Sequence, residues 1–132
     1  MNLNGRSTLV TGGAGGLGEA VVRLFAAAGA SVVIFDAAAD RARRLADELG
    51  DTVLAVAGDV LSETSVGEAV EVATGLGELS AVAIVHGAGV AGRTVNRDGT
   101  PHDLDLFQRT INLNIVGTFN VVRLAAVGMA GN

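Results

Sequence analysis

The order of apolar runs and helical periods along the chain predicts alternating strands and helices. Short apolar runs, typical of buried parallel strands, occur at residues 6–11, 31–36, 52–57 and 81–85. Apolar residues recur at helical spacing between these runs, at residues 17–28, 38–49 and 62–76. This alternation is typical of an α/β fold with a doubly wound parallel sheet, and right-handed crossovers favour the strand order 3-2-1-4.

Beyond the fourth predicted strand the pattern changes. No helical or strand period is present between Val90 and Pro101, and loops of this length are often functional or mobile. A long helix is predicted for residues 104–129, and the sequence ends at Asn132 with no fifth strand. We therefore expect residues 1–132 to be one portion of a single Rossmann-type domain, with an incomplete sheet whose fourth strand has an unpaired edge.

Composition argues against several classes of protein. Although 49% of the residues are hydrophobic, the apolar runs are short, and none approaches the ~20 residues of a membrane span, so we expect no membrane partner. The first residues do not resemble a secretory signal, from which we expect a cytoplasmic location. The sequence has no cysteine and only two histidines, His86 and His102, which argues against a metal site. A net charge of −5 without a basic stripe argues against nucleic-acid binding.

A glycine-rich segment between the first strand and the first helix carries the strongest functional signal. A strand-to-helix turn without Cβ atoms lets backbone N–H groups and the helix dipole bind a pyrophosphate. Three overlapping glycine motifs fit, namely Gly13, Gly15 and Gly18, or Gly12, Gly15 and Gly18, or Gly12, Gly16 and Gly18. A merely flexible turn is the alternative, and the absence of a following lysine excludes a Walker-type nucleotide site.

Asp36, at the end of the second strand, follows Gly18 by 18 residues. At this position a carboxylate can accept hydrogen bonds from both hydroxyls of an adenosine ribose. Its charge disfavours a 2′-phosphate, and the small neutral residues 37–39 offer no adjacent arginine, so NAD is favoured over NADP. The alternative role for Asp36 is to cap the following helix, and the two roles are compatible.

Together these features resemble the classical short-chain dehydrogenase/reductases over the whole chain. The matching positions are Thr11-Gly12-x-x-x-Gly16-x-Gly18, Asp36, Asp59-Val60, Ala88-Gly89 and Asn114-Ile115-Val116-Gly117. Residues 91–99, 104–109 and 114–124 are most similar to the type 2 3-hydroxyacyl-CoA dehydrogenases within that family. The resemblance implies an NAD cofactor, a small-molecule substrate for which an acyl-CoA is a candidate, and a homo-oligomer, usually a homotetramer.

The resemblance also implies roles for individual residues. It implies that Asp59 binds the amino group of the adenine and that Val60 contacts the cofactor through its backbone. It also implies that Ala88 and Gly89, being small, let the cofactor's ribose approach the backbone closely. The cofactor-binding residues expected in this way are Gly12, Gly15, Gly16, Leu17, Gly18, Asp36, Asp59, Val60, Ala88 and Gly89. At His86 and Gly87 the sequence departs from the family's pair of asparagines, and we interpret His86 as structural rather than catalytic.

Asn114 matches the asparagine of the family's catalytic tetrad, whose backbone carbonyl holds a water in a proton relay. The tetrad's tyrosine and lysine do not occur in the sequence, which contains neither residue type, and its serine would follow a fifth strand. The leading hypothesis is therefore an NAD-dependent oxidoreductase that interconverts a hydroxyl and a ketone, represented by its cofactor-binding part and inactive as 132 residues alone. The alternatives are a non-catalytic dinucleotide-binding protein and a half-domain completed by another chain.

Overall fold

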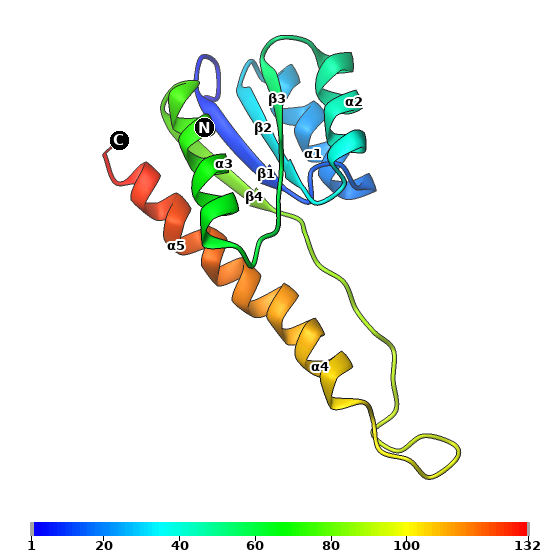
Figure 1. The fold of residues 1–132 in the computed structure, drawn as a ribbon. Helices are drawn as coiled ribbons and strands as arrows, with labels where there is room; N and C mark the ends of the chain where they lie inside the picture. The colour runs from blue at the N-terminus through cyan, green and yellow to red at the C-terminus, as the bar shows by residue number, and fades with distance from the viewer. Residues whose placement is uncertain (1, 132) are drawn as a thin grey trace.

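The computed structural model describes residues 2–131, so the first and last residues of the predicted domain lie outside the described part. Four parallel strands form one sheet: β1 (Ser7–Thr11), β2 (Ser31–Asp36), β3 (Val53–Ala57) and β4 (Leu79–Ile84). Their order is β3-β2-β1-β4, which confirms the order predicted from the sequence (Figure 1). β4 begins two residues earlier than expected, since Leu79 pairs with Ser7 across a local irregularity in the ladder.

The helices also follow the predicted pattern, with one exception. They are α1 (Gly16–Ala27), α2 (Ala39–Leu49), α3 (Glu63–Gly75), α4 (Leu104–Ile111) and α5 (Gly117–Met129). Between α4 and α5 lies η1 (Asn112–Val116), a π-helical segment that replaces the uninterrupted α-helix expected there. A single π turn changes the helical period by too little, over too few residues, to show in the spacing of apolar side chains.

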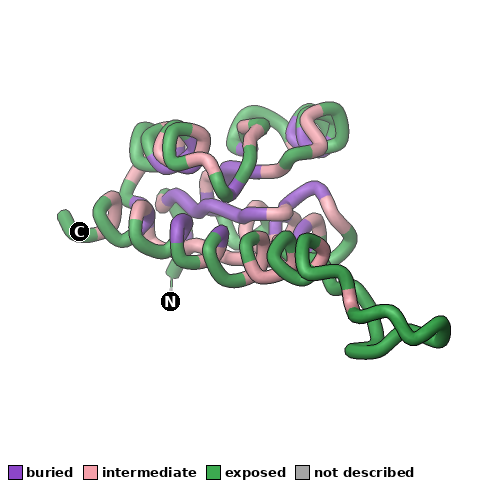
Figure 2. Tube along the Cα trace, turned by 60° about the horizontal axis from the view of Figure 1, so that its bottom comes forward, coloured by how far each residue is buried: buried purple, intermediate pink, exposed green. Residues whose placement is uncertain are grey.

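The sheet is covered by helices on both faces, which explains why its strands read as continuous apolar runs. Successive residues point to opposite faces, so Val10 and Ile34 pack in the cluster beneath α1 and α2, whereas Leu9, Val33 and Phe35 pack in the cluster beneath α3 and α5. Figure 2 shows the buried residues concentrated in the sheet, between the two helical layers.

The helical run from α4 to α5 is long and apolar, and several of its large apolar side chains are exposed. Leu104–Met129 form 26 helical residues that contain an 18-residue window with a mean hydropathy of 1.3, so length and composition alone would allow this run to cross a membrane. This corrects the expectation that no apolar stretch approaches that length. In the fold, α5 packs against α3 and β4 through Val121 and Ala125, while Phe107 and Phe119 on the same run are exposed.

β4 is an edge strand whose only sheet neighbour among the described residues is β1, as expected from the sequence. Beside it lies an apolar cleft of about 230 Å³, formed by β4 and α5 and lined by Val82, Ile84, Val122, Ala125, Ala126 and Met129. The loop between β4 and α4 extends away from the sheet (Figures 1 and 2). Its tip is closed by a bridge between Val95 and Pro101 and a hydrogen bond from the Asn96 N–H to the Thr100 carbonyl.

Candidate functional site

A pocket of about 300 Å³ lies at the carboxyl ends of the strands. It is next to β1, from which the chain continues to β2 and β3 on one side of the sheet and then crosses to β4 on the other side. Ligands of doubly wound sheets bind at this kind of topological switch point. The pocket brings together five of the predicted cofactor residues, Gly12, Gly15, Asp36, Asp59 and Val60. Gly16, Leu17, Gly18, Ala88 and Gly89 do not line it directly.

Two glycines are required by the turn between β1 and α1. Gly12 has a φ of +67°, and a Cβ there would lie 2.7 Å from the backbone nitrogen of His86. A Cβ on Gly18 would overlap the carbonyl oxygen of Gly12. The two glycine motifs that begin at Gly12 therefore contain both positions at which this turn has no room for a side chain.

Gly15 and Gly16 leave open space in front of α1. A Cβ on Gly15 would approach only the Gly12 carbonyl oxygen, at 3.5 Å, and one on Gly16 would meet nothing within 4 Å. Gly15 is the N-cap residue of α1 and supplies no capping side chain, while the side chain of Leu17 is exposed. No side chain in the described part of the chain caps the first-turn N–H groups of this helix, an arrangement suited to an anionic ligand.

Asp36 connects the end of β2 to the glycine turn. Its Oδ2 accepts a hydrogen bond from the Ala14 N–H at 2.9 Å, and its Oδ1 accepts one from the Ala38 N–H at 2.8 Å. The capping role considered for Asp36 thus takes the form of a bond to the residue just before α2, not to the first turn of the helix. Each carboxylate oxygen can accept a further hydrogen bond, so ribose hydroxyls in the pocket can still bind here.

Asp59 and Val60 lie in the loop between β3 and α3. The Asp59 Oδ1 accepts a hydrogen bond from the Leu61 N–H at 2.9 Å, and the carbonyl of buried Val60 accepts one from the Asn120 Nδ2 at 2.8 Å. The pocket is also lined by Gly58, directly before Asp59, and by Phe35, two residues that the sequence motifs did not indicate. A Cβ on Gly58 would lie 2.5 Å from the Phe35 ring. The glycine directly before Asp59 is therefore the feature of the sequence that could have indicated this close contact.

His86 follows β4 and contacts β1. Its Nδ1 lies 2.7 Å from the Thr11 Oγ1, and its buried Nε2 has no hydrogen-bond partner in the described structure. Burial lowers the pKa of His86 below its ordinary value of 6.5, and the nearby Leu113 backbone only partly opposes this shift. A neutral imidazole bonded to Thr11 supports the structural interpretation of this residue.

Asn114 lies in η1 and contacts the loop that follows β4. Its Nδ2 donates hydrogen bonds to the Ala88 carbonyl at 2.7 Å and to the Thr110 carbonyl at 2.8 Å. Ala88 and Gly89 are exposed, and a Cβ on Gly89 would meet nothing within 4 Å. The predicted catalytic asparagine therefore lies in a π-helical segment, an irregularity that is frequent at functional sites.

Comparison with known proteins identifies the family. The model of a family described as short chain dehydrogenase matches residues 6–132. The chain belongs to the short-chain dehydrogenase family. Members of this family are oxidoreductases, and the four parallel strands observed here form an incomplete Rossmann-type sheet.

Individual short-chain dehydrogenases match almost the whole chain. The type 2 3-hydroxyacyl-CoA dehydrogenase of Drosophila melanogaster is 43% identical over 127 residues, which cover 95% of this chain and 50% of that protein. A crystal structure of the type 2 enzyme from Mycobacterium avium is 50% identical with a TM-score of 0.92, covering 96% of this chain and 49% of the other. The 3-ketoacyl-(acyl-carrier-protein) reductase of Brucella melitensis, solved in complex with NADH, is 35% identical with a TM-score of 0.75, covering 92% and 48%. The chain thus spans about half the length of these relatives.

Proposed function

We propose that these residues form the cofactor-binding part of an NAD-dependent dehydrogenase that interconverts a hydroxyl and a ketone. The observation that carries the proposal is the pocket at the strand ends, where the glycine turn, Asp36 and Asp59 lie together. Gly15, Gly16 and the start of α1 would hold the pyrophosphate, Asp36 the adenosine ribose, and Asp59 with Val60 the adenine. When bound, NAD supplies the hydride acceptor.

The surroundings of Asp36 support NAD over NADP. A 2′-phosphate would add negative charge next to this carboxylate, and residues 37–39 are alanines that offer no compensating cation. Arg41 and Arg44 line a separate cleft together with Glu19 and Glu48. Glu19 and Glu48 form ion pairs with Arg23. Arg41 and Arg44 therefore belong to a cleft other than the pocket that Asp36 lines.

The type 2 relatives point to a 3-hydroxyacyl-CoA as the substrate of the whole protein. Asn114 would contribute its backbone carbonyl to a water-mediated proton relay. Transfer of the hydroxyl proton would require the tyrosine, lysine and serine of the family's tetrad, which these 132 residues do not supply in that arrangement. The chain by itself would bind the dinucleotide without turnover, and the exposed apolar face of α4 and α5 would serve a homo-oligomer.

The experiment that tests the proposal has two parts. Calorimetric titration of the protein with NAD and NADP should give tighter binding of NAD, and equal affinities would contradict the assignment of Asp36. The protein from the complete reading frame should then reduce NAD in the presence of a 3-hydroxyacyl-CoA.

A second candidate function rests on the open edge of β4 and the apolar cleft beside it. These features would also suit a dinucleotide-binding half-domain whose sheet is completed by another chain. The coding sequence beyond residue 132 separates the two proposals. A serine followed by Tyr-x-x-x-Lys supports the enzyme, and a stop codon supports the half-domain or a non-catalytic binding protein.

A further inference from the structure

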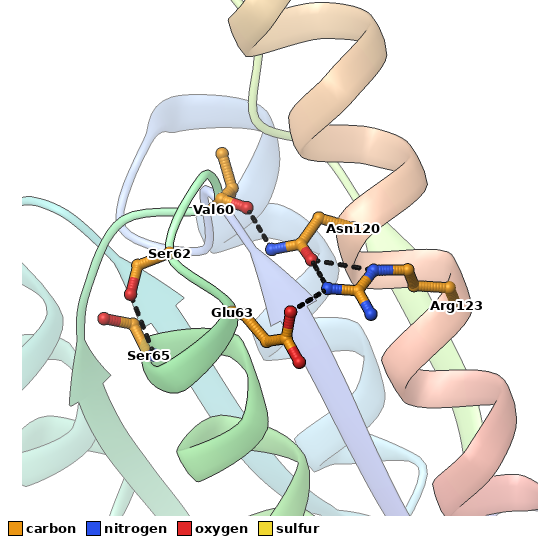
Figure 3. A network of polar contacts seen from close by, with 6 residues as sticks. All are labelled: Val60, Ser62, Glu63, Ser65, Asn120 and Arg123. Carbon is orange, nitrogen blue, oxygen red and sulfur yellow. Dashed lines mark hydrogen bonds and ion pairs between the residues drawn. The ribbon is translucent and has the colours of Figure 1, made fainter.

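A polar network connects α5 to the loop that carries Asp59 and Val60 (Figure 3). The buried side chain of Asn120 donates a hydrogen bond from Nδ2 to the Val60 carbonyl at 2.8 Å. The Asn120 Oδ1 accepts two hydrogen bonds from Arg123, at 3.1 Å from Nε and 2.7 Å from Nη2. Arg123 in turn forms an ion pair with Glu63, in the first turn of α3, at 2.7 Å.

Arg123 fixes the orientation of the Asn120 amide. A guanidinium has only donors, so the amide must present its oxygen to Arg123, and the NH₂ group then faces the Val60 carbonyl. The Arg123–Glu63 pair is largely exposed and contributes little stability by itself. The specific effect of Arg123 is therefore to keep the donor of Asn120 directed at the loop.

α5 holds Val60 on a second side as well. A Cβ on Gly117 would lie 2.7 Å from the Val60 Cγ2, so the Val60 side chain packs directly against the start of α5. Within residues 2–131, the one hydrogen bond of the Asp59 side chain is from the Leu61 N–H of its own loop. The position of the Asp59 carboxylate in the pocket consequently depends on how firmly α5 holds the adjacent Val60 peptide.

We infer that Asn120 is a positioning residue for the adenine end of the cofactor site. It does not line the pocket, and it acts by holding the Val60 peptide so that the Asp59 carboxylate and the Val60 backbone face the adenine. This inference rests on the proposed function. Asn114 does for the loop at Ala88 what Asn120 does for the loop at Val60, so one helical run positions both loops by side-chain amides.

The substitution Asn120→Asp tests this role. It preserves shape and leaves an oxygen for Arg123, but it turns a second oxygen toward the Val60 carbonyl, where two acceptors repel each other. The ligands are NAD and nicotinamide hypoxanthine dinucleotide, in which a carbonyl replaces the adenine amino group. We expect the variant to bind NAD about tenfold more weakly, the consequence of leaving one buried acceptor unpaired. Binding of the hypoxanthine dinucleotide should change much less, so the preference for adenine falls.

Asn112→Asp is the matched control, because it adds the same charge to the same helical run at an exposed residue whose side chain has no hydrogen bond in the described structure. It should leave the affinities for both dinucleotides unchanged. If it instead weakens NAD binding as Asn120→Asp does, the added charge explains the effect and the inference is overturned. Arg123→Met releases the Asn120 amide without removing its donor. It should lower the preference for NAD over the hypoxanthine dinucleotide by a smaller factor than Asn120→Asp does. If Asn120→Asp does not fold, Arg123→Met serves as the test variant.

Equal weakening of both dinucleotides in Asn120→Asp would show a merely structural role and overturn the inference alone. If the unmodified protein binds the two dinucleotides equally, adenine is not recognised at this loop, and the inference again falls while dinucleotide binding stands. If the unmodified protein binds neither, the proposed function fails and the inference fails with it. Titrations should use the protein from its complete reading frame.

Discussion

The Oγ1 of Thr11 and the Nδ1 of His86 lie 2.7 Å apart and join the ends of β1 and β4. The backbone of His86 at the same time occupies the space that a side chain on Gly12 would need. His86 also lines the pocket, so the pocket contains an imidazole at a position where the family resemblance implies an asparagine. This imidazole is held neutral by burial, since its pKa lies below the ordinary 6.5.

The first prediction is that His86 makes stability depend on pH in a defined window. The unfolded chain takes up a proton at His86 near its ordinary pKa of 6.5, whereas the folded chain does so only at lower pH. Stability from this residue is complete above pH 6.5 and is lost as pH falls from 6.5 toward the lowered pKa of the folded state. Thermal unfolding between pH 8 and pH 5 should show a smaller acid-side decrease in the melting temperature for His86→Asn. Parallel pH profiles for the two proteins would refute this role.

The second prediction contrasts two glycines of one motif. Gly18→Val should prevent cofactor binding and destabilise the fold by about 1–3 kcal/mol or more, as overpacked sites do. The structural reason is that a Cβ at position 18 would overlap the Gly12 carbonyl. Gly16→Ala fills open space at the start of α1 and should retain or raise stability by up to about 1 kcal/mol while weakening dinucleotide binding. Urea unfolding measures both changes, and a Gly18→Val protein of normal stability and affinity would show that the turn can rearrange.

The third prediction concerns Asp36. Asp36→Ala should reduce NAD affinity by about 1.5–3 kcal/mol, or roughly ten- to a hundredfold, and should reduce NADP affinity much less. Because Asp36 also accepts the N–H groups of Ala14 and Ala38, its removal should lower the melting temperature too. The ratio of the two affinities, measured by calorimetry on folded protein, separates ribose recognition from loss of structure. If Asp36→Ala leaves the ratio of NAD to NADP affinity unchanged, Asp36 does not bind the adenosine ribose.

The sequence predicts the parts of this molecule that depend on local pattern. Strand order, the glycine turn and the place of Asp36 follow from apolar periodicity and spacing, since each reflects neighbours in the chain or a general rule of handedness. η1 and the bond from Asn120 to Val60 could not be predicted in this way. Asn120 lies in an apolar helix, and its partner is a backbone carbonyl 60 residues earlier that only the tertiary fold brings close.

The last prediction is that the 132-residue polypeptide, expressed alone, will self-associate and oxidise no hydroxyacyl substrate. Among the described residues no strand lies on the outer side of β4, which contains no charged residue, and its Val82 and Ile84 are only half-buried beside the apolar cleft. Val82→Lys places a charge on this edge and should increase the monomer fraction in size-exclusion chromatography with light scattering. Without the family's tyrosine and lysine the polypeptide lacks general acid–base catalysis, worth about 10²–10⁴ in rate. A stable unmodified monomer would refute the edge argument. Reduction of NAD by that same fraction would show that the proton acceptor lies within these residues.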